Sequence, residues 1–424
     1  MNARTFAVVV ATTLAFAPSC RPPDAAGETD PALSALVDSL LPAVERVSLL
    51  SASRPVRVDV RSSDQVRQFV VRKLDEELPA PELEGIRRVY ARLGLIPEDL
   101  DLRALLLELF SEQIAGYYDP DTETLHVLRG ASLPSLRPVL IHEMVHALQD
   151  QHVDLDSLIS RERGNDRQTA AQAALEGHAT LAMFALLAEE ASGAPVDPVT
   201  LPDPASQLRP AFEDPSGQFP VFRSAPRVIR ETLVFPYAAG SSFVQQLWRA
   251  AGPVAERRAP LGPLLPQSTE QVMHPLQKFS PVLDPPTELR FTGFGDWRSV
   301  YENVLGALET GILLEEHLGR IETPAWGWDG DRYALLERPD GAEAVVWASV
   351  WDDVASADTF AERMTRVLQD GASDRTGIVE RIELETRPAV LVRIAGMSLP
   401  ASDIPRPGVF CVDAAGQAIR CSLR

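Results

Sequence analysis

Three of the chain's seven histidines fall within the stretch VLIHEMVHALQDQH, which covers residues 139–152. His142 and His146 flank Glu143 in the pattern H-E-x-x-H. On a helix, residues four apart lie on one face about one turn apart, so both imidazoles can direct a nitrogen at one metal ion. Glu143 projects beside them, where a carboxylate can take a proton from a water that the metal activates. The pattern therefore predicts a hydrolytic metal site.

Two residues compete for the place of the third protein ligand. His152 falls where metzincin peptidases carry theirs, in H-E-x-x-H-x-x-G-x-x-H, but Gln149 replaces the glycine at which such a helix stops. If the helix continues, His152 lies ~9 Å further along the axis than His146 and off the shared face. Glu176 lies in a later helical stretch and can present a carboxylate if that helix packs antiparallel to the first. We expect Glu176 to complete the site, with His152 as the alternative.

The local pattern also predicts the elements that position these residues. Apolar residues surround the histidines, which predicts a buried helix that opens around residues 134–137. Residues 167–191, rich in Ala and Leu, predict a second helix that carries Glu176. Residues 114–128 alternate in polarity around an Asp-Pro-Asp turn, which predicts a β-hairpin. An edge strand of such a hairpin can align an extended peptide, although it is equally consistent with a plain sheet hairpin.

Five segments together resemble a known group of proteins. These are EQIAGYYDPDTETLHV, HEMVHALQDQH, LEGHAT, FPYAAGSSF and STEQVMHP. They are similar to a poorly characterised bacterial family of exported proteins that look like gluzincins, a branch of the zinc metallopeptidases. The resemblance covers roughly residues 80–280 and implies a zincin fold and a Zn²⁺ ion held by His142, His146 and Glu176. It implies no particular substrate.

The resemblance also directs attention to residues outside the ligand set. Gluzincins typically use a Tyr or a His to stabilise the oxyanion that forms when water attacks a peptide carbonyl. Tyr237, on a predicted helix beside Gly240, and His274, in STEQVMHP, are the two candidates. Both remain open, and core or loop packing is the alternative for each.

Several other polar residues have weaker claims to a role near the metal. Asp150 and Thr180 are candidates to orient the ligating histidines. His178 lies two positions from Glu176 and so points away from it on a helix, which favours a packing role, with a place in the lining of the cleft as the alternative. His126 closes a predicted strand, which indicates a structural role.

The composition restricts the partners of the chain. It holds 60 acidic and 40 basic residues, for a net charge of −20, and its hydrophobic fraction of 45% is that of a soluble globular protein. Nucleic acid and anionic membrane surfaces need clustered Lys and Arg, so the charge argues against both. We expect a peptide or protein substrate instead.

Residues 1–19 predict an export signal, with Arg4 before an apolar stretch too short to span a bilayer. The ending Ala-Pro-Ser-Cys resembles a bacterial lipobox, in which Cys20 is acylated and anchors the mature chain. Pro18 is unusual in a lipobox, so plain cleavage and secretion is the alternative. A polar tether follows at residues 20–31. We expect the protein in the bacterial cell envelope, on the periplasmic or outer surface, and otherwise secreted.

The other cysteines are Cys411 and Cys421, which flank a short segment with a central glycine. In an oxidising compartment they predict a disulfide that closes a C-terminal hairpin. Two unpaired thiols are the alternative.

The pattern of elements predicts an α+β fold in two parts. Residues 32–285 form a zincin-like metallopeptidase domain, mainly helical with a small sheet, and residues 286–424 form a smaller α+β domain. In the first part, prolines at 193–226 predict a long surface loop, and a further helix starts or kinks at Pro236. The second part begins with a helix at 298–318 and continues as strand–strand–helix–strand.

These observations favour a zinc peptidase in which Glu143 deprotonates water for attack on a peptide carbonyl. The rival is a non-catalytic envelope lipoprotein that uses the same fold as a scaffold or binding module. An intact Glu143 favours the enzyme.

Overall fold

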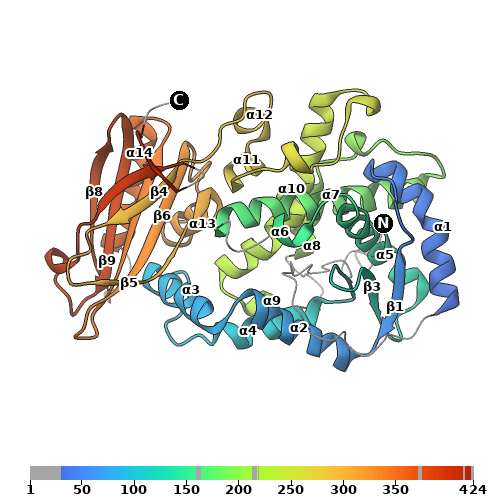
Figure 1. Cartoon of the computed structure of the whole chain (residues 1–424), viewed down its shortest axis with the longest axis horizontal. Coiled ribbons are helices and arrows are strands. Elements are labelled where there is room, and N and C mark those ends of the chain that lie inside the picture. Colours follow the sequence, from blue (N-terminus) through green and yellow to red (C-terminus); the bar gives the residue numbers. More distant parts are fainter. Residues whose placement is uncertain are drawn as a thin grey trace.

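The computed structural model describes residues 30–158, 164–212, 217, 219–370, 375–413 and 416–421. The predicted export signal and Cys20 lie outside these residues. The chain is an α+β protein, with a five-stranded sheet at one end, a three-stranded sheet near the other, and helices between them (Figure 1). Within the described ranges, no helix combines the length and apolar character that a membrane crossing needs.

The first part of the chain is mainly helical. Its elements are, in order, α1 (Pro31–Ser48), β1 (Arg57–Arg61), α2 (Ser63–Glu77), α3 (Ala80–Leu93), α4 (Leu102–Gln113), β2 (Gly116–Asp119), β3 (Thr124–Leu128), α5 (Leu133–Asp150), α6 (Leu155–Leu158), α7 (Asn165–Ser192), η2 (Pro198–Thr200), α8 (Pro204–Phe212), α9 (Pro220–Ser224), α10 (Arg227–Ala251), η3 (Val254–Glu256), η4 (Gly262–Leu264), α11 (Thr269–Met273) and α12 (Pro275–Lys278).

The second part is built around antiparallel strands. Its elements are β4 (Glu288–Thr292), β5 (Arg298–Asn303), α13 (Gly306–Leu318), β6 (Trp328–Glu337), β7 (Glu343–Trp351), α14 (Val354–Asp370), β8 (Arg375–Leu384), β9 (Arg387–Gly396), η5 (Ala401–Asp403), β10 (Gly408–Val412) and β11 (Ala418–Ile419).

The small sheet has the strand order β1-β3-β2 and supports α5. β2 and β3 form the predicted antiparallel hairpin, with Tyr117 opposite His126. β1 joins β3 in parallel, with Arg57 opposite Thr124. Apolar residues of α1, α5 and α7 cover this sheet in one core, which includes Leu40 and Leu140. The sheet and these three helices therefore form one scaffold.

α7 and α10 cross at unusually close range. A Cβ atom added to Gly177 would lie 2.0 Å from the main-chain carbon of Gly240, and one added to Gly240 would lie 1.9 Å from the carbonyl oxygen of Ala173. No side chain fits at either position, so glycine is what allows the two backbones to touch. This crossing fixes the height of Tyr237 relative to Glu176, because each lies within one turn of a crossing glycine.

The five-stranded sheet has the order β5-β6-β7-β9-β8 and is antiparallel throughout. α14 packs against β7, β8 and β9, and the buried Phe360 of this helix contacts Trp347 and Trp351. β4, β10 and β11 form a separate small sheet. Cys411 and Cys421 are joined by a disulfide next to the β10–β11 pair, as the sequence predicts.

The two parts are joined through a continuous apolar core. One cluster of buried side chains runs from Phe69 in α2 through Val228 in α10 to Val392 in β9. α13 lies within it and contacts α7, α10, α11 and α14. The Asp331 carboxylate of β6 accepts hydrogen bonds from the main-chain amides of Leu305 and Gly306, which stabilises the start of α13.

Three of the predicted elements differ in the structure. The predicted helix at 298–318 is strand β5 followed by α13, because Asn303 and Gly306 interrupt the helical pattern. The predicted loop at 193–226 holds η2, α8 and α9, since prolines at their first positions favour short helices. α10 begins at Arg227 and runs through Pro236, so that proline does not mark its start.

Candidate metal centre

Three ligand atoms from two helices converge at one point. His142 Nε2 lies 3.0 Å from Glu176 Oε2 and 3.1 Å from His146 Nε2, and His146 Nε2 lies 3.4 Å from Glu176 Oε2. The two histidines come from consecutive turns of α5 and the glutamate from α7. All three residues are at most 4% exposed. The structure thus brings together the ligand set expected from the sequence.

The spacing of these atoms fits a small divalent cation. Three ligands of a tetrahedral zinc ion, each about 2.0–2.1 Å from the metal, lie about 3.3 Å from one another. The observed separations of 3.0–3.4 Å match this triangle. Two imidazoles and a carboxylate are also a donor set that zinc accepts, and three protein ligands leave a fourth position for water or substrate.

Electrostatic attraction links the ligand side chains of the cluster to one another. Glu176 raises the pKa of His146 to about 9, although burial opposes this shift. His146 and His142 in turn lower the pKa of Glu176, against its own burial. The buried carboxylate is therefore stabilised by positive charge at the point where the three ligand atoms meet.

Glu143 lies on the same helix with one oxygen held and the other free. Its Oε2 accepts a hydrogen bond of 2.9 Å from the main-chain amide of Tyr118 in β2. Its Oε1 is buried and has no hydrogen-bond partner in the described part of the chain. Burial raises the pKa of Glu143 to about 8; Glu176 adds to this rise and His146 opposes it. The free oxygen is the one that a water at the centre can reach.

Tyr237 of α10 reaches the same cluster. Its ring stacks on that of His142 with centroids 6.0 Å apart, and its hydroxyl is within hydrogen-bonding range of Glu176. Burial and the carboxylates of Glu176 and Glu143 raise its pKa well above the usual value, so it stays protonated and can donate. Gly240, three residues after Tyr237, allows the close approach of α10 to α7.

His274 has a different environment. It ends α11, and its ring packs edge-on against Trp326 with centroids 4.8 Å apart. Among the residues that the structure describes, no contact joins His274 to the cluster. Of the two oxyanion candidates, only Tyr237 lies at the metal centre.

His152 is also remote from the ligand triangle. α5 continues to Asp150, past Gln149, as the missing glycine suggests. The Nδ1–H of His152 donates a hydrogen bond of 2.8 Å to the carbonyl oxygen of Leu148, at the end of that helix. His152 therefore satisfies a helix-end carbonyl, and Glu176 takes the third position of the triangle.

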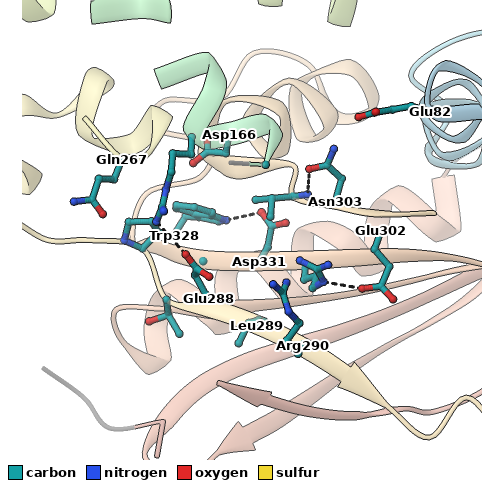
Figure 2. Close-up of a pocket in the computed structure, with 17 residues that line it drawn as sticks. Glu82, Asp166, Gln267, Glu288, Leu289, Arg290, Glu302, Asn303, Trp328 and Asp331 are labelled. Carbon is teal, nitrogen blue, oxygen red and sulfur yellow. Dashed lines mark hydrogen bonds and ion pairs between the residues drawn. The ribbon is translucent and has the colours of Figure 1, made fainter. Parts of the chain in front are cut away.

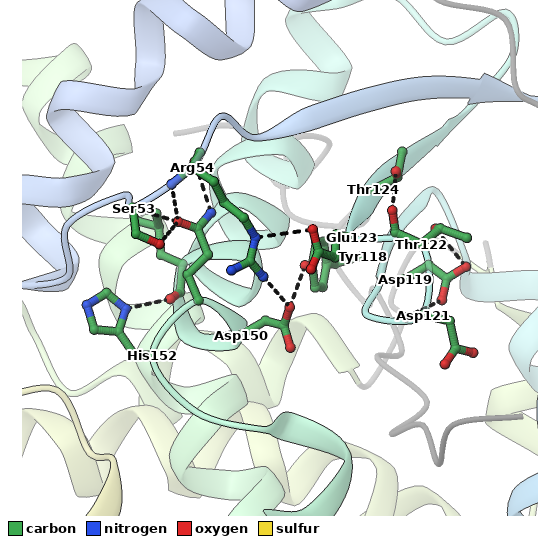
Figure 3. Close-up of polar contacts among 12 residues, drawn as sticks. Ser53, Arg54, Tyr118, Asp119, Asp121, Thr122, Glu123, Thr124, Asp150 and His152 are labelled. Atoms are coloured by element: carbon green, nitrogen blue, oxygen red, sulfur yellow. Dashed lines mark hydrogen bonds and ion pairs between the residues drawn. The ribbon is translucent and has the colours of Figure 1, made fainter.

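The predicted orienting residues do not reach the histidines. Asp150 instead accepts hydrogen bonds from the Tyr118 hydroxyl at 2.8 Å and from Arg54 at 3.2 Å (Figure 3). The hydroxyl of Thr180 is buried and has no hydrogen-bond partner among the described side chains. His126 Nδ1 accepts from Arg61 at 3.2 Å, which agrees with a structural role.

Sequence reasoning missed Gln149, which contacts a ligating histidine, and His178, which contacts Gln149 in turn. His146 Nδ1 lies 2.8 Å from Gln149 Oε1, and Gln149 Nε2 lies 3.1 Å from His178 Nδ1. Gln149 is three positions after His146, on the same face of the helix, and this spacing was the available signal. For His178 the sequence favours a packing role and does not indicate its contact with Gln149.

A second group of carboxylates, Asp284, Asp329 and Asp352, lies between the two parts of the chain. Lys278 Nζ lies 2.9 Å from Asp284 and 2.5 Å from Asp352, and Arg387 lies 2.6 Å from Asp329. Each of the three carboxylates is thus paired with one of these two cations. It is an ion-pair network that ties α12 to the second part.

A pocket of about 390 Å³ opens near the start of α7, between that helix and strands β4 and β6 (Figure 2). Its charged side chains are largely paired with one another, as Arg167 is with Glu288 at 3.1 Å and Arg332 with Glu302 at 2.8 Å. None of the predicted site residues lines it. It is a feature of the junction, separate from the metal centre.

Comparison with known proteins adds one match. A family model described as "Domain of unknown function (DUF8575)" matches residues 294–398. The match covers a minor part of the chain, inside the predicted C-terminal domain, and contains none of the ligand-triangle residues. Neither a curated protein nor a solved structure matches the chain. The metal centre therefore rests on its own geometry, and the chain contains a segment similar to a domain of unknown function.

Proposed function

We propose that the protein is a zinc-dependent peptidase of the gluzincin type. The observation that carries the proposal is the convergence of His142 Nε2, His146 Nε2 and Glu176 Oε2 at 3.0–3.4 Å from one another. The free oxygen of Glu143 beside this triangle supports it further. A zincin-like architecture is part of the proposal, and the packing of α5 against the β1-β3-β2 sheet supports it.

Each side chain of the cluster has a separate role in the proposed reaction. A zinc ion held by the two histidines and Glu176 would polarise a water molecule and the carbonyl that it attacks. Glu143 accepts the proton of that water through Oε1 and then delivers it to the nitrogen of the leaving amine. The Tyr118 amide keeps the other oxygen of Glu143 fixed throughout, so the carboxylate does not have to reorient between the two proton transfers.

Tyr237 is the proposed stabiliser of the oxyanion. As a peptide carbonyl becomes tetrahedral, its oxygen gains negative charge and needs a donor already in place. Tyr237 is held over the ligand triangle by the α7–α10 crossing and remains protonated. β2, the edge strand whose Tyr118 binds Glu143, is the proposed guide for an extended peptide substrate.

The burial of the cluster favours a second candidate function. His142 and Glu143 are 0% exposed, His146 is 2% exposed and Glu176 and Tyr237 are 4% exposed. A substrate must be able to reach the open coordination position of a catalytic zinc, and residues this deeply buried offer little access to it. A non-catalytic envelope protein whose zinc stabilises the fold would have such a centre.

Metal content combined with turnover separates the two functions. The mature full-length protein should hold one equivalent of zinc and cleave members of a broad peptide library. Glu143→Gln keeps the shape of the site, so zinc should remain while cleavage falls by about 10²–10⁴-fold, the usual contribution of a general base. Zinc binding without cleavage would favour the structural role, and a chain that binds no zinc would refute both.

We also propose that the protein is exported and anchored through an acylated Cys20, on the basis of the sequence alone. Mass spectrometry of the mature N-terminus should find a lipidated cysteine. A free N-terminus further along the chain would instead indicate secretion.

A further inference from the structure

A chain of buried hydrogen bonds leads from His146 to the end of α1. His146 Nδ1 is 2.8 Å from Gln149 Oε1, and Gln149 Nε2 is 3.1 Å from both His178 Nδ1 and the carbonyl oxygen of Leu175. His178 Nε2 is 2.8 Å from the carbonyl oxygen of Ser48. Gln149 and His178 are both 0% exposed, so water cannot replace these bonds.

The donor and acceptor of every hydrogen bond in this series follow from the carbonyl oxygens of Leu175 and Ser48. A carbonyl oxygen only accepts, so the Gln149 atom that faces Leu175 must be the amide nitrogen. That nitrogen only donates, so His178 Nδ1 must be without a proton. The proton of His178 is then on Nε2, which agrees with its bond to Ser48.

The same reasoning fixes the tautomer of His146. Because the amide nitrogen of Gln149 donates to Leu175 and His178, the atom that faces His146 is the amide oxygen. An amide oxygen only accepts. His146 Nδ1 therefore carries a proton, which leaves Nε2 as the nitrogen that faces the ligand triangle and is available to a metal. His142 differs, because its Nδ1 is buried and has no hydrogen-bond partner within the described residues.

We propose that Gln149 and His178 are positioning residues that hold His146 in its zinc-binding tautomer before the metal arrives. This inference rests on the proposed zinc site and deepens it. We call the hydrogen-bonded series Gln149–His178–Ser48 the relay. Only His146 is oriented by it, so the two histidines are prepared for the metal in different ways. It also explains the glutamine that replaces the metzincin glycine.

The relay joins three helices to the metal centre. Ser48 is the last residue of α1, and its carbonyl is one of those that a helix end leaves without an internal partner. Leu175 directly precedes the ligand Glu176 on α7. Through Gln149, the position of α5 is thus tied to α7 next to Glu176 and, through His178, to α1.

The first test reads the tautomer directly in the wild-type protein. Nitrogen-15 NMR of the imidazoles, recorded on the metal-free full-length chain, distinguishes a proton on Nδ1 from one on Nε2. At a pH at which His146 is neutral, it should appear as the Nδ1–H form before zinc is added, and the Nδ1 proton should remain after zinc binds. A metal-free His146 that carries its proton on Nε2 would overturn the proposal, and no variant is needed to see it.

The second test measures zinc affinity by competition with a chelator. Gln149→Met has a similar volume but cannot accept from His146, so zinc should bind about 10–100-fold more weakly, as expected for the loss of an outer partner of a ligand. Thr180→Val is the matched control, because it removes a buried hydroxyl, one turn from Glu176, that has no hydrogen-bond partner in the described part of the chain. Its affinity should stay within about twofold of wild type, well below the effect of an outer partner.

The outcomes separate this inference from the proposed function. If Gln149→Met folds and binds zinc as tightly as wild type, the relay has no role while the zinc site stands. If the wild-type chain binds no zinc, the proposed function fails, and the tautomer of His146 still decides whether the relay exists.

Discussion

Gly177 of α7 and Gly240 of α10 touch through their backbones, and this contact sets the distance between Glu176 and Tyr237. Gly240→Ala would place a methyl group 1.9 Å from the carbonyl oxygen of Ala173, so the helices must move apart. We expect a loss of about 1–3 kcal/mol in the free energy of unfolding, typical of overpacking, together with a drop in hydrolysis. Urea unfolding and a peptidase assay measure the two effects.

A matched glycine provides the control for this substitution. Gly311 lies inside helix α13, where an added methyl group would meet only the side chain of Pro324, at 3.0 Å. Gly311→Ala should therefore cost far less stability and leave hydrolysis unchanged. Equal effects of the two substitutions would show that the α7–α10 crossing is not special.

Substitution of the two candidate third ligands should have opposite results. Glu176→Ala removes an atom of the triangle, so zinc affinity should fall by more than the roughly 10–100-fold that loss of an outer partner costs. His152→Ala removes only a bond to the Leu148 carbonyl, so zinc affinity should be retained. Zinc content after dialysis against graded chelator distinguishes them, and the reverse result would make His152 the ligand.

Tyr237→Phe should slow catalysis without releasing the metal. The ring keeps its stacking on His142, while the hydroxyl that we propose as the oxyanion donor is lost. We expect kcat to fall by about 10²–10³-fold, as for other oxyanion donors, with zinc content unchanged. His274→Ala, at a site remote from the cluster, is the comparison. A larger effect of His274→Ala would assign the oxyanion to His274.

The disulfide should contribute measurably to stability. The bond between Cys411 and Cys421 closes a ring with a sequence separation of 10, for which restriction of the unfolded chain predicts about 2–3 kcal/mol. The double variant Cys411→Ala/Cys421→Ala should lose about this much. Thiol titration of the unreduced protein should find neither cysteine free, and two reactive thiols would contradict the pairing.

Asp166 should make stability depend on pH. Burial raises its pKa to about 7 and Asp331 adds to the rise, while the hydrogen bonds from Thr269 and the charge of Arg167 oppose it. An unfolded Asp has a pKa of about 3.9, so the native state binds the proton more tightly. This stabilisation is fully present below about pH 4 and is lost as the pH rises towards 7.

Asp166→Asn should flatten this dependence. Between the two pKa values, the unfolding free energy of the wild type should fall as the pH rises. It should fall more steeply than that of the variant, by up to about 1.4 kcal/mol per pH unit. Asp340→Asn is the control, because the Asp340 pKa is lowered to about 2 and its charge is constant in this range. Parallel pH curves for wild type and Asp166→Asn would contradict the prediction.

The sequence predicted the metal cluster well because its signals are local. His142 and His146 are one turn apart, and Glu176 lies in a strongly helical stretch, so only the packing of two helices had to be assumed. The relay was missed because His178 is 29 residues from Gln149 and 130 from Ser48, and no local pattern encodes such pairs. The parallel pairing of β1 with β3 was missed for the same reason. Asp59 pairs with His126, and helices α2, α3 and α4 lie between these two residues in the sequence.

The placement of α1 and β1 limits how this chain can be matured by proteolysis. β1 is hydrogen-bonded to β3, α1 shares its core with α5 and α7, and the last carbonyl of α1 receives the bond from His178. A prosegment that is cut away to activate an enzyme must leave the catalytic scaffold intact. Removal of residues 30–61 would instead dismantle the support of His146, so this region belongs to the folded scaffold of the metal cluster and is not a removable prosegment.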